Sequence, residues 1–238
     1  MKLDFRPYLR RPVILTTFVV FLASLVLVRL GLWQVSRYYQ RQQFNDHYLE
    51  QTNAEMLDLD AINSDSLDLS GMEYRKVTFR AMTIPGESIV RINQYFQSEL
   101  GYSLITPYLL RSGSIVFVDR GWIPSSGNET PDDWDVYNQN GVQQIIGLVR
   151  IPITVNEPNI DRFWVDFDYS KMQARTDKKV LPIFIQQFPA QGEDTIPPIP
   201  QILKVEISEG PHAGYALQWF TFAIILLAGY PFYLRAIK

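Results

Sequence analysis

The chain contains two histidines, His47 and His212, and histidine is the residue here best able to bind a metal. His212 stands three residues before an apolar run that begins at Tyr215. Trp219 and Phe222 follow Tyr215 at the spacings of four and three residues that place side chains on one face of a helix. A helix here would therefore carry an imidazole beside an aromatic surface, whereas His47 has no such surroundings. The alternative is an ordinary belt of interfacial residues that anchors a membrane helix.

Two long apolar segments, Val13–Trp33 and Tyr215–Leu234, lie near the ends of the 238-residue chain. Each is close to the ~20 residues that a helix needs to cross ~30 Å of hydrocarbon. The first is longer than most signal-peptide cores and no clear cleavage site follows it, which favours a retained anchor. We therefore predict a two-pass membrane protein.

Charge is distributed unevenly along the chain. Residues 1–41 carry seven Lys/Arg and one Asp, and residues 235–238 carry two more basic residues, whereas residues 42–210 carry 13 Lys/Arg and 24 Asp/Glu. By the positive-inside rule, both termini are expected in the cytoplasm and the acidic middle outside it. The few residues ahead of the first span are too short for a mitochondrial presequence, which favours a bacterial plasma (inner) membrane. An acidic domain also argues against nucleic acid as a partner.

The middle of the chain has the pattern of a β-rich domain. Many short strands separated by turn signals predict an antiparallel barrel or sandwich. The strand candidates are Tyr74–Arg80, Ser88–Phe96, Tyr102–Leu110, Ser114–Ile123, Val142–Ile151, Arg162–Tyr169, Val180–Gln187 and Gln201–Ile207. A short helix is expected in Asp168–Asp177, a loop in Gln191–Pro200, and a continuation of the first membrane helix through Gln34–Gln51.

The expected fold class is therefore a membrane α plus β-rich protein, in which two transmembrane helices bracket an antiparallel β barrel or sandwich-like outer domain with a minor helix. Its parts are a cytoplasmic N-terminus (1–12), transmembrane helix 1 (13–33), a juxtamembrane helix with an acidic connection (34–73), a β-rich extracytoplasmic domain (74–211), transmembrane helix 2 with its outer end (212–234) and a cytoplasmic tail (235–238).

Catalytic signatures are missing from the sequence. It has no phosphate-binding GxxxxGK[ST] motif, no HExxH, no GxSxG and no metal-spaced histidine cluster. The absence of cysteine excludes disulfides, thiolate metal sites and cysteine nucleophiles. We therefore expect a binding protein rather than an enzyme.

Four short strings stand out in the remaining sequence. They are Leu30-Gly31-Leu32-Trp33-Gln34 followed by Arg37; Thr106-Pro107, Gly113 and Val118-Asp119-Arg120-Gly121-Trp122-Ile123-Pro124; Gly147-Leu148-Val149-Arg150-Ile151-Pro152; and His212 followed by Tyr215-Ala216-Leu217-Gln218-Trp219-Phe220. In this order, with a span at each end, the chain resembles the Surfeit locus protein 1 family, the membrane-anchored cytochrome c oxidase assembly factors. It departs from the family at Asp119, where Asn is usual, and at Glu209-Gly210-Pro211, where an Asn commonly precedes the histidine.

The resemblance implies an assembly factor for a haem-copper oxidase. Its partners would be the lipid bilayer and oxidase subunits, especially the haem-bearing catalytic subunit, with the haem a synthesis enzyme as a further partner. It also implies that the chain binds haem a with His212 as the axial ligand of the iron, because a neutral imidazole suits that role. The implied cofactor-binding residues are His212, Tyr215, Trp219, Trp33, Gln34 and Arg37, the arginine pairing with haem propionates.

Other interpretations of these residues remain open. Gln34 and Gln218 could instead hydrogen-bond across a packed pair of helices, and Arg37 and Arg41 could be solvated near lipid headgroups. The chain could also be a scaffold that binds oxidase subunits without haem, or a membrane-anchored extracytoplasmic enzyme of unknown chemistry.

The string Val118–Pro124 is interpreted as a strand that leaves its sheet. Gly121 permits unusual backbone angles, and Pro124 fixes the exit of the chain. Arg120 and Trp122 are expected either to pack on the core or to face the membrane and a partner. The favoured interpretation is that this string has a structural role, as the corner at which the chain leaves the sheet.

Overall fold

The computed structural model describes residues 11–61, 69–153, 161–189, 196–202 and 205–236. These residues form two compact units. One contains the chain up to His47 and from Glu206 onward, and is built on two helices. The other runs from Tyr48 to Val205 and contains the strands.

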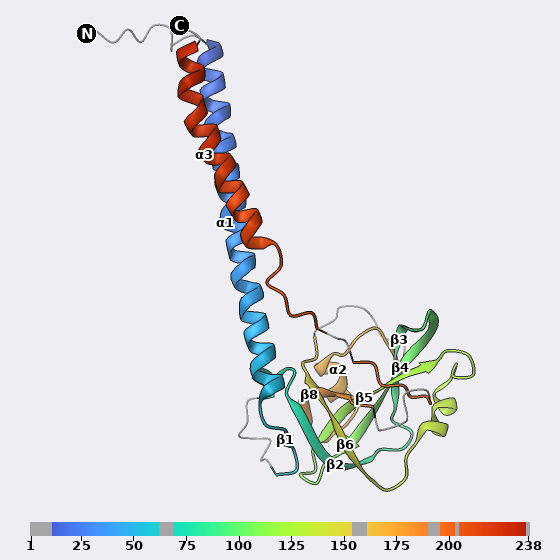
Figure 1. Ribbon diagram of the computed structural model, residues 1–238. Helices are drawn as coiled ribbons and strands as arrows, with labels where there is room; N and C mark the ends of the chain where they lie inside the picture. Colours follow the sequence, from blue (N-terminus) through green and yellow to red (C-terminus); the bar gives the residue numbers. More distant parts are fainter. Residues whose placement is uncertain (1–10, 62–68, 154–160, 190–195, 203–204, 237–238) are drawn as a thin grey trace. The chain divides into compact units, whose positions relative to one another are not determined.

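The helical unit consists of α1 (Arg11–Asn53), whose residues from Tyr48 onward are assigned to the second unit, and α3 (His212–Ala236) (Figure 1). Both helices are long and apolar enough to cross a membrane. Only 11% of the most apolar window of α1 and 6% of that of α3 is buried, so these are not core helices of a soluble domain. The predicted pair of long apolar helices is thus confirmed, and their places in the chain are consistent with the predicted bracketing of a β-rich domain.

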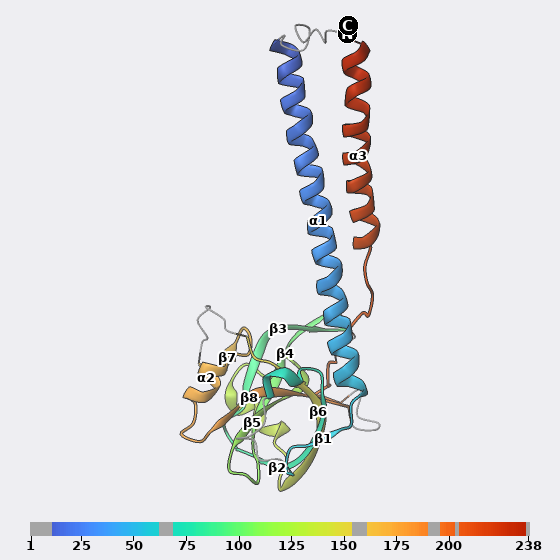
Figure 2. The same ribbon diagram turned by 90° about the vertical axis from the view of Figure 1, so that its left-hand side faces the viewer.

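α1 and α3 lie side by side and antiparallel, so that α1 begins at the end where α3 finishes (Figure 2). Beyond its first turn, α1 buries Ser24, Gly31 and Asn45, which fall on one stripe with intervals that are multiples of seven. α3 buries Ala216 and Ala223, also seven apart. A seven-residue repeat keeps one face of a helix towards its neighbour, as in coiled coils.

Small residues allow the two helices to approach closely. A Cβ added to Gly31 would lie only 2.6 Å from Cε1 of Phe220. Near the other end of the pair, the hydroxyls of Thr17 and Tyr230 are hydrogen-bonded. These contacts fix the register in which residues of α1 meet residues of α3.

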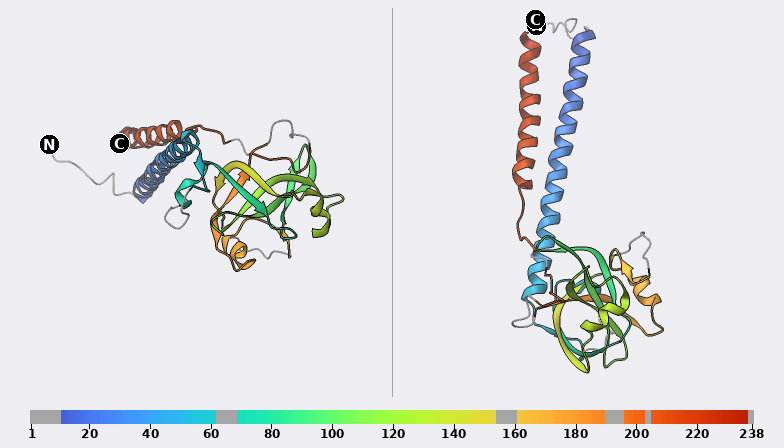
Figure 3. Two further views of the ribbon diagram at one scale, coloured as in Figure 1. Left: turned by 90° about the horizontal axis from the view of Figure 1, so that it is seen from below. Right: turned by 90° about the vertical axis from the view of Figure 1, so that its right-hand side faces the viewer.

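The second unit is a β barrel. Its strands are β1 (Leu57–Asp58), β2 (Lys76–Thr83), β3 (Ile89–Phe96), β4 (Glu99–Leu109), β5 (Ile115–Pro124), β6 (Val142–Arg150), β7 (Phe163–Trp164) and β8 (Val180–Gln187). Their order is β1-β2-β6-β8-β5-β4-β3-β7, and an additional pairing of β2 with β4 closes the ring. The strands curl around a common interior (Figures 1 and 3).

The expectation of a wholly antiparallel sheet was wrong. β5 and β8 pair in parallel, as do the short strands β1 with β2 and β7 with β3. Parallel neighbours need a long crossover, and the chain between β5 and β8 supplies one that includes β6, β7 and α2 (Tyr169–Ala174). The other pairings of β2, β3, β4, β5, β6 and β8 are antiparallel.

Two expected strands also differ from the structure. Only Phe163–Trp164 of the candidate Arg162–Tyr169 is extended in a sheet, because the side chain of Asp168 caps α2 by accepting hydrogen bonds from the amides of Ser170 and Lys171. In Gln201–Ile207 the described residues form no strand; residues 203–204 lie outside the described residues.

Other expectations agree in part with the structure. The short helix expected in Asp168–Asp177 is present as α2, and α1 continues without a break to Asn53. Of the loop Gln191–Pro200, residues 191–195 lie outside the described residues, as do residues 62–68 of the acidic connection. Two short 3-10 helices, Leu69–Met72 and Pro131–Tyr137, complete the described elements.

Candidate functional site

His212 and Gln34 meet within the helical unit. His212 is the first residue of α3, and its Nδ1 lies 2.9 Å from Oε1 of Gln34 on α1. Because a carbonyl oxygen can only accept, Nδ1 is the donor in this hydrogen bond. In the neutral imidazole with this tautomer, Nε2 bears the lone pair that can bind a metal.

The segment before α3 is hydrogen-bonded to side chains of α1, and these bonds help to position His212 beside α1. Arg41 Nε donates to the carbonyl oxygen of Ser208 at 2.9 Å, and Asn45 Nδ2 donates to the same oxygen at 3.1 Å. Arg41 also donates to the carbonyl of Glu206. The sequence did not indicate this role for Arg41 and Asn45. Their acceptors are backbone carbonyls, which every residue carries, so no residue type marks the partner.

The aromatic residues of α3 extend from His212 along the helix. Tyr215 is 46% exposed, and the ring of Trp219 packs edge-on against Phe222 with centroids 6.2 Å apart. Apolar surface is therefore available near the imidazole, on a helix that leaves much of its surface uncovered within this chain.

Trp33 and Arg37 are joined to each other on α1. The Arg37 guanidinium lies 5.7 Å from the centre of the Trp33 ring, and its Nη1 donates to Gln40 Oε1 at 3.1 Å. Within the described helices, the alternative bond between Gln34 and Gln218 is not formed, because Gln34 Oε1 bonds to His212 and Gln218 is exposed.

This arrangement fits a ligand that needs one nitrogen donor and an apolar surface. No group of three or more His, Cys, Asp or Glu residues that could hold a metal ion occurs in the described parts of the chain. The half-buried imidazole, with Nδ1 bonded to Gln34, instead suits an axial bond from Nε2 to haem iron, for which one histidine is sufficient.

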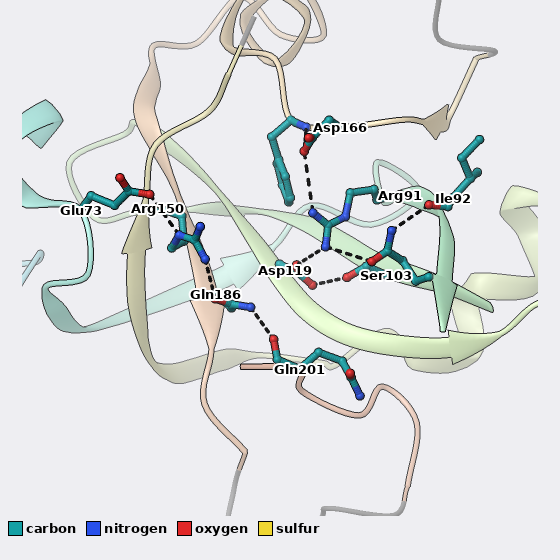
Figure 4. A network of polar contacts seen from close by, with 11 residues as sticks. Glu73, Arg91, Ile92, Ser103, Asp119, Arg150, Asp166, Gln186 and Gln201 are labelled. Atoms are coloured by element: carbon teal, nitrogen blue, oxygen red, sulfur yellow. Dashed lines mark hydrogen bonds and ion pairs between the residues drawn. The ribbon is translucent and has the colours of Figure 1, made fainter. Parts of the chain in front are cut away.

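A second polar cluster lies in the barrel and centres on Asp119 of β5 (Figure 4). The carboxylate is buried; its Oδ1 accepts hydrogen bonds from the Ser103 hydroxyl and, at 3.1 Å, from the Gly121 amide. Its Oδ2 lies 3.7 Å from Nη2 of Arg91. Burial raises the pKa of Asp119, although the positive charge of Arg91 and these hydrogen bonds oppose the rise.

A second arginine extends the cluster across the barrel. Arg150 Nε lies 3.3 Å from Glu73 Oε1, and its Nη1 donates to Gln186 Oε1 at 3.2 Å. Gln186 in turn donates to the carbonyl of Gln201 (Figure 4). Asp119 and Arg150 stood out in the sequence only as members of strings, and nothing there indicated that Arg91 would join them.

The string Val118–Pro124 forms the end of β5. Arg120 and Trp122 are each 4% exposed, and Trp122 packs against Phe96 with centroids 5.4 Å apart. Gly121 has a φ of +116°, the kind of backbone angle expected of it. Pro124 is the last residue of the strand, where its carbonyl accepts a hydrogen bond from Asn128 at 2.9 Å. The partner-facing role of the string stays a prediction.

Comparison with known proteins extends over both units. The sequence model of the SURF1 family matches residues 21–224, which run from within α1, through the barrel, to within α3. The chain belongs to the SURF1 family. The matched range contains both His212 and Asp119, and the family is linked to the assembly of cytochrome oxidase.

Proteins from Rickettsia that are named SURF1-like are similar in sequence to this chain along nearly their whole length, which supports the family assignment. A SURF1-like protein of Rickettsia conorii is 26% identical over 92% of this chain and 91% of its own. A SURF1-like protein of Rickettsia prowazekii is 24% identical over 98% of this chain and 90% of its own.

Proposed function

We propose that this chain is a membrane-anchored assembly factor for a haem-copper cytochrome c oxidase, and that it binds haem a and passes it to the haem-bearing catalytic subunit. Its chemistry would be binding and transfer, not catalysis. Family membership supports the assembly role, and the state of His212 supports the haem role.

The observation that carries the haem proposal is the bond between His212 Nδ1 and Gln34 Oε1 at 2.9 Å. It fixes the orientation of the ring and directs the lone pair to Nε2. A hydrogen bond to the far nitrogen of a ligating histidine also raises the basicity of the ligand, as partners of metal-bound histidines do in general. Gln34 would thus position His212 without touching the iron.

The remaining residues of the candidate site would recognise the macrocycle. Tyr215 and Trp219 would offer their rings to its apolar face, and Trp33 would do so from α1. Arg37, which is exposed and held only by Gln40 and the Trp33 ring among the described residues, would pair with a propionate. The bound haem would supply the redox-active iron that the oxidase requires.

We also propose a position for the chain in the cell. Both helices would cross a bacterial plasma membrane, with the two termini in the cytoplasm and the barrel outside. The basic ends of the chain and its acidic middle support this orientation. Oxidase subunits, the catalytic one above all, and the haem a synthesis enzyme would be the partners.

The haem proposal is tested by the absorption spectrum of the full chain purified in detergent from cells that make haem a. Wild-type protein should show a Soret band, and His212→Ala should lose it. His47→Ala, which changes the other histidine, is the matched control and should keep it. Gln34→Leu should weaken haem binding and shift the band, because the imidazole loses its positioning partner. A colourless wild-type protein, or an unchanged spectrum in His212→Ala, would refute the haem role.

The assembly role can be tested separately from haem. Oxidase subunits should co-purify with the chain, and in a strain that makes no haem a this recovery should fall if haem transfer drives the encounter. Equal recovery in the two strains would support the scaffold alternative, in which the chain binds oxidase subunits without haem. Failure to recover any oxidase subunit in either strain would count against both.

A further inference from the structure

A cavity of about 260 Å³ opens on the surface of the second unit. It is lined by residues of β5, of the 3-10 helix Pro131–Tyr137, of the end of β8 and of the segment 196–200. The residues that shape it most are Arg120, Val136, Tyr137, Gln187, Ile196 and Pro198. They lie within the second unit.

The charged group of this cavity is Arg120, which is only 4% exposed. Its Nη1 donates to the carbonyl oxygen of Tyr137 at 2.7 Å. The ion pairs found among the described residues involve Arg91, Arg150 and Arg175 but not Arg120. Burial lowers the pKa of Arg120, and no carboxylate of the described chain opposes this effect.

A buried arginine with no counter-charge is costly, and proteins normally pair such a group. A second group at the cavity is unsatisfied as well, because the buried Oε1 of Gln187 has no hydrogen-bond partner among the described residues. Within the described chain, Arg120 lacks a counter-charge, and Gln187 Oε1, which can only accept, lacks a donor. The arrangement suits a site in which a ligand supplies the missing negative charge.

The walls of the cavity indicate the rest of the ligand. Val136 is 78% exposed and Ile196 is 65% exposed, so two large aliphatic side chains stand uncovered at its edge. The three prolines among the lining residues have no N–H to donate. A ligand here would meet one fixed cation, the amide side chains of Asn138, Gln139 and Gln187, and the apolar side chains of Val136, Ile196 and the prolines.

We infer that this cavity binds a small organic monocarboxylate with an apolar body, whose carboxylate pairs with Arg120. The planar guanidinium fork matches a carboxylate and can bind both of its oxygens. One negative charge balances the single cation, whereas a dianion such as phosphate would leave one negative charge without a counter-charge among the lining residues. The inference does not depend on haem binding at His212.

The test is isothermal titration of the full chain in detergent, without haem, using 3-phenylpropionate as the probe. The matched neutral probe is 3-phenylpropionamide, which should bind roughly 10- to 100-fold more weakly because it lacks the charge. Inorganic phosphate should not compete. The variant Arg120→Met should lose binding of the acid, and Arg111→Met, which removes an exposed arginine, should retain it.

A purely structural role for Arg120 makes the opposite predictions. If the arginine served only to hold the Tyr137 carbonyl, Arg120→Met would unfold at a lower temperature and the wild type would bind neither probe. Arg120→Lys, which keeps a charge and a donor, would then restore stability with no ligand present. Equal affinity for the acid and the amide, or acid binding that survives in Arg120→Met, would overturn the inference.

One further variant tests whether the chain supplies the carboxylate itself. Glu193 and Asp194 lie outside the described residues and are both neutralised in Glu193→Gln/Asp194→Asn. If the acid binds only to this double variant, the natural occupant is a carboxylate of the chain and not a separate ligand, and the inference is wrong. Equal binding by wild type and double variant supports it.

Discussion

Replacing Gly121 with alanine should destabilise the barrel severely. Gly121 lies in β5 with a φ of +116°, in a region that residues with a side chain rarely adopt. An alanine Cβ would also overlap the backbone carbonyl of Ile199. That carbonyl accepts a hydrogen bond from the Trp122 amide at 2.7 Å, and the Ile199 amide donates back to Trp122 at 2.8 Å. One methyl group therefore disturbs both the backbone angle and a paired segment.

The expected loss follows from these two costs. An unfavourable positive φ costs about 1–3 kcal/mol for a residue with a side chain. The overlap leaves the new carbon roughly 1 Å short of an ordinary C···O contact of about 3.3 Å, and forcing extra volume into a packed site costs about 1–3 kcal/mol. Gly121→Ala should therefore lower the free energy of unfolding by about 2–6 kcal/mol, with a value in the upper part of that range if the Ile199 pairing breaks.

Two other glycines separate the two costs. Gly113 has a φ of +86° and open space where an added Cβ would lie, so Gly113→Ala should show the angle cost by itself. Gly147 has no positive φ, but its Cβ would meet the carbonyl of Gln186 on β8, so Gly147→Ala should show the overlap cost by itself. Each should lose about 1–3 kcal/mol, and Gly121→Ala should lose more than either.

The measurement is urea unfolding of the full chain in detergent, followed by the fluorescence of its tryptophans, with thermal unfolding as a second probe. A loss of this size corresponds to a fall in Tm of roughly 4–24 °C for a domain of this length. If Gly121→Ala is no less stable than Gly113→Ala, the close approach of Ile199 contributes nothing, and the reasoning from the structure is refuted.

Two further changes test other parts of the molecule. Because burial raises the pKa of Asp119 in the folded protein, the folded state binds that proton more tightly than the unfolded state, so this residue costs stability as pH rises from about 4 through the raised pKa. The asparagine in Asp119→Asn does not titrate, so the free energy of unfolding of this variant should increase relative to that of the wild type as the pH rises through this range. Urea unfolding at a series of pH values measures this difference, and a difference that does not change with pH would contradict the raised pKa. In the helical unit, Gly31→Val would bring its Cβ against the Phe220 ring and should cost about 1–3 kcal/mol. Gly214→Val, whose Cβ meets open space, is its control, and equal thermal unfolding of the two variants by circular dichroism would show that the helices do not pack closely at Gly31.

Several local features of this protein could be predicted from the sequence alone. The two long helices follow from uninterrupted apolar length, which is a local property that no distant contact needs to supply. Most strands of the barrel were also predicted, and Val180–Gln187 agrees with β8 at both ends. The unusual backbone angle of Gly121 was predictable because only glycine adopts it readily.

The candidate residues, by contrast, received their partners only in three dimensions. His212 and Gln34 are distant in sequence, and no local pattern indicated that Gln34 would bond to His212 and not to Gln218. Likewise, Asp119 meets Arg91 only because β3, β4 and β5 are neighbours in the barrel.

The closed ring and the buried charge of Arg120 also depended on the tertiary structure. Closure requires β2 to pair with β4 as well as β6, and the parallel pairing of β5 with β8 depends on a crossover whose path the sequence does not specify. The burial of Arg120 is not evident from its residue type, because arginine is rarely buried. The sequence determined the two helices that are apolar and long enough to cross a membrane and most of the strands, since periodicity and apolar length act locally. The tertiary structure decided which charges and hydrogen-bonding groups meet, since the energy of those contacts depends on distances between residues far apart in the chain.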